Sequence, residues 1–82
     1  MTKAELRAEL ESGTGVLGNT AEDEPVFLLV ARDRTSSKTV RQWRQNAFDM
    51  GCQNAAKLAE ANAVALAMAQ WRDLHGGGKT PD

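Results

Sequence analysis

The chain has 82 residues, a net charge of −1 and only four aromatic side chains. Its single cysteine and single histidine exclude an intrachain disulfide and are too few for a structural zinc site, and the near-neutral charge argues against a protein that coats DNA. A chain this short buries only about 60–65% of its unfolded surface, so we expect it to gain stability as a homo-oligomer.

Residues 1–22 are predicted to form a mobile acidic arm. Thr2 followed by Glu5 fits a capping box, which is typical of a short helix beginning there. Three glycines between Ser12 and Thr20 indicate a loop after it. Residues 1–24 hold six acids against two bases, whereas the rest of the chain holds eight bases against five acids. The near-neutral total therefore hides an acidic arm and a basic region.

The segment 25–33 contains the longest apolar run, from Val26 to Ala31. Its β-branched and aromatic residues favour a strand by propensity. Pro25, however, suits the first position of a helix, and no other stretch could pair with a strand. We therefore predict a short helix over 25–33, with a strand as the alternative.

A clearer helix is predicted over 36–50. Thr35 or Ser36 can cap its first turn, and Gly51 can end it. Apolar residues recur at spacings of three and four, which predicts that this stripe faces the core: Val40, Trp43, Ala47 and Met50.

The last helix is predicted over 54–73, between Asn54 and the glycines at 76–78, and a tail follows over 76–82. The short connection between the two long helices implies an antiparallel hairpin. The predicted inner face of the last helix comprises Leu58, Ala61, Val64, Ala65, Met68 and Trp71. Further alanines extend this apolar surface beyond what one hairpin can cover. The expected fold is therefore all-α: short N-terminal helices, then an antiparallel hairpin within a helical domain at 23–75, completed by homo-oligomerisation.

The residues offer little for catalysis. Cys52 and His75 lie at opposite ends of the predicted last helix, so they do not suggest a nucleophile and its base. The glycines at 13–18 match a dinucleotide-binding spacing, but no strand precedes them, so they are interpreted as a linker. We therefore expect no enzyme, no metal and no cofactor. The lack of an apolar leader or membrane span, together with the lone thiol, predicts a cytoplasmic protein.

One cluster predicts a binding site. Five bases fall within a short stretch, and Phe48 lies one helical turn after the last of them; the candidate residues are Arg32, Arg34, Lys38, Arg41, Arg44 and Phe48. Guanidinium groups hold phosphate oxygens well, and a phenyl ring can stack on a base. The cluster therefore predicts a small anionic ligand such as a nucleotide. A solvated helix face, or electrostatic docking to a protein or RNA, would use the same groups.

Residues 24–82 resemble a family of small phage and prophage proteins. That family shows E-P-x-F-x-L-x-A-x-D, then V-x-x-W, then A-M-x-x-W and K-x-P-D; the corresponding segments here begin at Glu24, Val40, Ala67 and Lys79. The family often has a proline where Ser37 stands. More distantly the chain resembles the phage anti-CBASS sponges, symmetric homo-oligomers that sequester cyclic nucleotides between protomers. The resemblance implies an anti-defence protein that binds a host immune nucleotide without cleaving it.

Two other functions use the same surfaces. An anti-defence inhibitor could bind a host effector directly, such as a CRISPR complex, through a complementary surface. A small DNA-binding regulator could use the helix at 36–50 for recognition, although the acidic arm weakens this interpretation.

Overall fold

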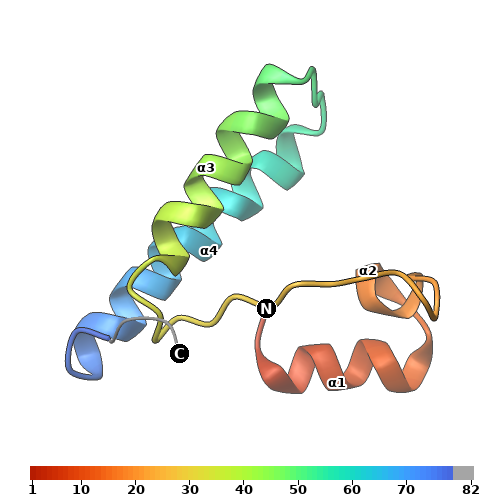
Figure 1. Ribbon diagram of the computed structural model, residues 1–82, viewed down its shortest axis with the longest axis horizontal. Helices are drawn as coiled ribbons and strands as arrows, with labels where there is room; N and C mark the ends of the chain where they lie inside the picture. The colour runs from red at the N-terminus through yellow and green to blue at the C-terminus, as the bar shows by residue number, and fades with distance from the viewer. Residues whose placement is uncertain (79–82) are drawn as a thin grey trace.

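The computed structural model describes residues 1–78 and is helical, with no strand in that part of the chain (Figure 1). Its elements are α1 (Lys3–Ser12), α2 (Gly15–Gly18), α3 (Ser36–Asp49) and α4 (Ala55–Leu74). The two long helices pack side by side as an antiparallel hairpin (Figure 1). The predicted fold class is confirmed, and both long helices begin and end within one residue of the predicted bounds.

The hairpin turn is set by local backbone chemistry. Gly51 has a φ of 90°, a left-handed conformation in which a side chain is strained. Beyond it the amide of Cys52 donates to the carbonyl of Ala47 at 2.9 Å, which closes α3 with a Schellman motif. The Asn54 side chain then accepts from the amide of Lys57 at 3.0 Å and caps α4. Gly51 and Asn54, which were predicted to end α3 and to cap α4, therefore set the two ends of the connection.

The core lies between α3 and α4 and is made of small side chains. On α4, Leu58, Ala61 and Ala65 are buried, as predicted. Opposite them the buried Ser37 donates its hydroxyl to the carbonyl of Ala65 at 2.9 Å. The Ser37 hydroxyl reaches a backbone carbonyl of α4 because the two helix backbones lie close together, and the small alanine side chains of α4 allow this approach. The core is consequently narrow, and no aromatic ring of residues 1–78 is buried in it.

The predicted inner stripe of α3 needs a correction. Trp43 is 47% exposed and Met50 is 89% exposed, so neither belongs to the core. The helix instead turns the buried Ser37 toward α4, while Arg44 is half-buried. Positions 37, 40, 44 and 47 have the same helical spacing as the predicted stripe but are rotated around the axis. The close helix contact at Ser37 sets the rotation of α3 about its axis. Side-chain hydrophobicity alone would have turned Trp43 toward α4.

The helix predicted over 25–33 is wrong, because this segment is extended to residue 30 and then turns into α3. Pro25 and the β-branched residues already favour extended backbone. The far end of the segment is held by tertiary bonds: Arg72 of α4 donates to the carbonyls of Asp33 and Arg34 at 3.0 and 2.7 Å. An extended segment therefore persists here without a partner strand in residues 1–78, because a side chain of α4 fixes its end.

The N-terminal unit, residues 1–20, stands apart from the hairpin. The Thr2 hydroxyl accepts from the amide of Glu5 at 3.3 Å, so α1 begins at the predicted cap. Helices α1 and α2 pack on each other, and the backbone of neither comes close to that of α3 or α4 (Figure 1), although Leu6 of α1 and Met68 of α4 line a common groove. The radius of gyration is 13.8 Å, against about 11.7 Å for a compact chain of this length. With extents of 35 × 31 × 21 Å, the molecule is therefore open and flattened.

Two remaining sequence predictions concern the ends and the membrane. The tail predicted over 76–82 follows α4 as far as Gly78, and its last four residues lie outside the described residues. Within residues 1–78, no helix combines the length and the apolar character that crossing a bilayer requires.

Candidate functional site

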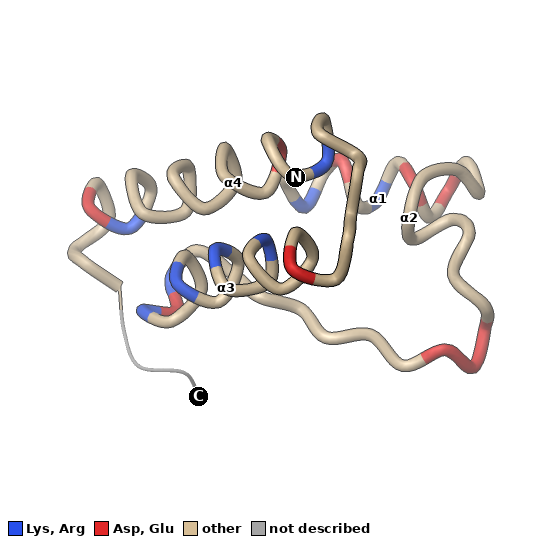
Figure 2. The backbone as a smooth tube through the Cα atoms, turned by 90° about the horizontal axis from the view of Figure 1, so that it is seen from above, with Lys and Arg blue, Asp and Glu red and all other residues tan. Residues whose placement is uncertain are grey.

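The bases gather along α3 and the turn before it, while acids outnumber bases in residues 1–24 (Figure 2). Arg32 and Arg34 are exposed in the turn that leads into α3. Lys38 and Arg41 are exposed on α3 itself, one turn apart. The structure therefore brings four of the six predicted site residues to one continuous stretch of surface, which we call the basic flank and define as Arg32, Arg34, Lys38 and Arg41.

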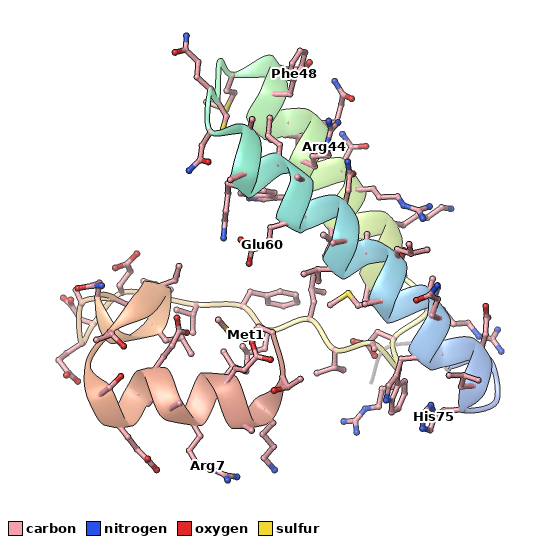
Figure 3. All side chains as sticks on the ribbon, turned by 180° about the vertical axis from the view of Figure 1, so that it is seen from behind. Met1, Arg7, Arg44, Phe48, Glu60 and His75 are labelled. Carbon is pink, nitrogen blue, oxygen red and sulfur yellow. The ribbon has the colours of Figure 1, made fainter. Side chains whose placement is uncertain are left out.

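The other two predicted site residues, Arg44 and Phe48, lie one turn apart on the same side of the hairpin (Figure 3). Phe48 is 57% exposed, so its ring is available for stacking. Arg44 differs from the prediction because it is half-buried against α4. Its Nε is enclosed and has no hydrogen-bond partner among the described residues. Arg44 therefore belongs partly to the helix interface and presents less of its guanidinium to a ligand than its neighbours do.

The charges of the basic flank are not neutralised within residues 1–78. The ion pair in this part of the chain joins Lys57 and Glu60 of α4, with a distance of 3.5 Å between nitrogen and oxygen. Asp49, at the end of α3, instead accepts a hydrogen bond from Gln45 at 2.9 Å. Exposed cations without an acidic partner make a positive surface that attracts anions.

Most of the basic flank lies outside three hollows on the surface of the described chain. A groove of about 540 Å³ lies between α1, the extended segment and α4 and includes Leu6, Val30, Met68 and Trp71. A cavity of about 220 Å³ includes Trp43 and the Lys57–Glu60 pair, and a third of about 610 Å³ lies on α3. Lys38 is the one predicted site residue that lines any of these three hollows, and it lines the hollow on α3. A single chain thus presents the bases on an open surface.

Sequence reasoning missed Arg72. Its guanidinium Nη1 bonds two carbonyls of the turn that carries Arg32 and Arg34. An arginine in the last turn of a helix is usually attributed to the helix dipole, so its position gave no signal of this role. Arg72 acts as a positioning residue, because it holds the basic turn against the end of α4.

The reactive side chains are far apart. Cys52 lies in the hairpin turn, and His75 lies beyond the other end of α4, a helix of 20 residues or ~30 Å. His75 stacks on Trp71 with 3.9 Å between ring centroids. In residues 1–78 no three metal-binding side chains come together. The described chain thus places His75 far from the thiol of Cys52.

Comparisons with protein families, curated proteins and solved structures found no match to this chain. The functional argument therefore rests on the residues and surfaces described above.

Proposed function

We propose that this protein binds a small phosphate-bearing ligand, a signalling cyclic nucleotide, without cleaving it. The observation that carries the proposal is the basic flank, whose four cations are exposed and have no ion-pair partner in residues 1–78. Such cations hold phosphate oxygens by charge-assisted hydrogen bonds. Arg41 and Lys38 supply two of them from a rigid helix, which costs little reorganisation when the ligand binds.

Phe48 supports a nucleotide over an inorganic anion. Its ring is more than half exposed on the same side of the hairpin as Arg44. A base can stack on an exposed phenyl ring while neighbouring arginines hold the phosphates. The flank and Phe48, which follows it on α3, therefore offer the two contacts that a nucleotide requires.

The proposal includes a homo-oligomer, because one chain presents these groups on an open surface. Two or more copies related by symmetry would bring their flanks together and enclose a ligand with several phosphates between them. The resemblance to phage proteins supports a setting in which such binding sequesters a host immune signal in the cytoplasm.

Isothermal titration calorimetry against cyclic di- and trinucleotides and ADP-ribose derivatives tests this function. We expect Arg41→Ala to weaken binding by about tenfold to a hundredfold, the loss of a charge-assisted contact. Arg7→Ala, which removes an exposed arginine from α1, is the matched control and should bind normally. The ligand should be recovered intact by chromatography. Absence of binding by folded protein, or equal losses in both variants, would contradict the proposal.

Direct binding to a host effector protein is a second candidate, supported by the extended segment. Phe27 is 85% exposed and Leu28 is 65% exposed, which is unusual for adjacent large apolar side chains. A purified CRISPR effector complex is a suitable probe. Binding that is lost in Phe27→Ser and insensitive to nucleotides would favour this candidate over the first.

A further inference from the structure

The N-terminal unit is not stabilised by the rest of its own chain. None of its residues is buried. Its helices have 10 and 4 residues, and isolated helices shorter than about 12–15 residues are marginal in water. Leu10 and Val16 are 64% and 68% exposed. The groove that Leu6 shares with Met68 of α4 buries little of this unit, so further packing against another surface would stabilise its helices.

The exposed area of the chain is large enough to accommodate such packing. The chain exposes 6405 Å², whereas a compact monomer of 8.9 kDa exposes about 4,800 Å². The excess of about 1,600 Å² exceeds the ~800 Å² that each partner buries in a standard protein interface. An additional interface of ordinary size would thus restore the surface expected of a compact protein.

Charge indicates what the unit packs against. Residues 1–24 hold six acids and two bases, whereas residues 25–78 hold seven bases and four acids. Neither set is paired internally in the described chain, apart from Lys57 with Glu60. Three acids make no hydrogen bond among residues 1–78 and are free to pair elsewhere: Glu11, Glu22 and Asp23.

Within one chain the two surfaces do not meet. Among the described residues, no acid of residues 1–24 forms an ion pair with a base of the flank. The backbone of α1 also stays away from that of α3, which carries Lys38 and Arg41 (Figure 1). The unit therefore leaves the flank of its own chain open. The chain between Asn19 and Arg32, before the turn that Arg72 holds, can span about 45 Å when extended, which is enough to reach a neighbouring molecule.

We propose that residues 1–24 of one copy, which comprise the N-terminal unit and the acids directly after it, dock on the basic flank of a second copy, and that the second copy returns the contact. The interface is then a reciprocal exchange of arms, in which free acids of one chain meet Lys38 and Arg41 of the other and α1 gains a packing surface. This inference does not depend on the proposed ligand. A phosphate-bearing ligand would compete with the arm for the same bases, so the test uses protein washed at high salt and free of nucleotide.

Sedimentation velocity with charge-reversed variants tests the exchange. The arm variant carries Glu11→Lys, Glu22→Lys and Asp23→Lys, and the flank variant carries Lys38→Glu and Arg41→Glu. We expect wild-type protein to form dimers at low salt that weaken at 0.5 M NaCl, because exposed ion pairs are screened. Each variant alone should dissociate at least tenfold more readily. Lys57→Glu, a reversal beside Glu60 on the side facing α1, is the matched control and should behave as wild type.

Mixing the two variants distinguishes arm exchange from a dimer held by different contacts. Reversed arms should pair with reversed flanks, so an equimolar mixture should regain a salt-sensitive dimer that neither variant forms alone. Circular dichroism checks that each variant keeps its helices. A folded wild-type protein that stays monomeric at low salt would overturn the proposal, as would a dimer unaffected by either reversal. A mixture that fails to dimerise would overturn it as well.

Discussion

A single side chain, Arg72, connects the fold to the candidate site. It holds the carbonyls of Asp33 and Arg34 and so fixes the turn that carries two bases of the flank. We expect Arg72→Ala to lower the free energy of unfolding by about 1.5–3 kcal/mol, because hydrogen bonds to a charged group are lost. Urea denaturation measures this change. A ligand titration should also show weaker binding, through the loosened turn.

Two further substitutions control this prediction. Arg72→Lys keeps the charge but lacks the planar guanidinium whose Nη1 reaches both carbonyls. Most of the loss in the free energy of unfolding should therefore remain. Arg7→Ala removes an arginine from an exposed helix face and should change the free energy of unfolding by less than about 0.5 kcal/mol. A stability for Arg72→Ala equal to that of wild type would show that the turn is held by other contacts.

At the scale of the element, the hairpin depends on its connection. Gly51 ends α3 in a left-handed conformation with φ at 90°, and an added Cβ would meet no atom within 4 Å. The cost of Gly51→Ala is therefore backbone strain alone, and we expect a loss of about 1–2 kcal/mol in urea denaturation. Gly51→Asn should lose less, because asparagine tolerates this region better. Equal losses for the two variants would contradict strain as the cause.

At the scale of the whole molecule, a narrow core is combined with an extensive exposed surface. Only Leu58, Ala61 and Ala65 form the buried apolar core among residues 1–78. If copies assemble by exchanging arms, stability depends on protein concentration by mass action. We expect the Tm to rise by about 3–6 °C for each tenfold increase in concentration. Differential scanning calorimetry across two decades of concentration measures this. The Lys38→Glu and Arg41→Glu flank variant should show a Tm that is nearly constant.

Prediction from the sequence worked best where the signal is local. The caps at Thr2 and Asn54 and the stop at Gly51 each act within one helical turn, and the structure places them where the residues indicated. Half of the predicted inner face of α4 is buried, namely Leu58, Ala61 and Ala65, but Trp71 of the same predicted face is 44% exposed because no part of α3 reaches the end of α4 to cover it. The six candidate site residues were predicted as one cluster, and four of them share an exposed surface.

The failures occurred where two parts of the chain meet. Trp43 is the most hydrophobic residue of its helix and was predicted to be buried, yet Ser37 turns toward α4 instead. A hydrophobicity scale ranks side chains by their free energy of transfer from water. A close contact between two helices, however, admits only side chains small enough to fit between the backbones. Likewise, segment 25–33 was predicted to be helical because no partner strand exists, and the bonds from Arg72 could not be foreseen from its spacing.

The sequence by itself determined the all-α fold, the position of the hairpin turn and the separation of an acidic arm from a basic region. These properties depend on residues close together in the chain, so neighbouring residues are enough to specify them. Only the tertiary structure decided the rotation of α3, the extended path before it and the exposure of the flank. Each of these depends on contacts between residues far apart in the chain, such as the hydroxyl of Ser37 with the carbonyl of Ala65. Such contacts depend on how the shapes of two helices fit together, in addition to the composition of each helix.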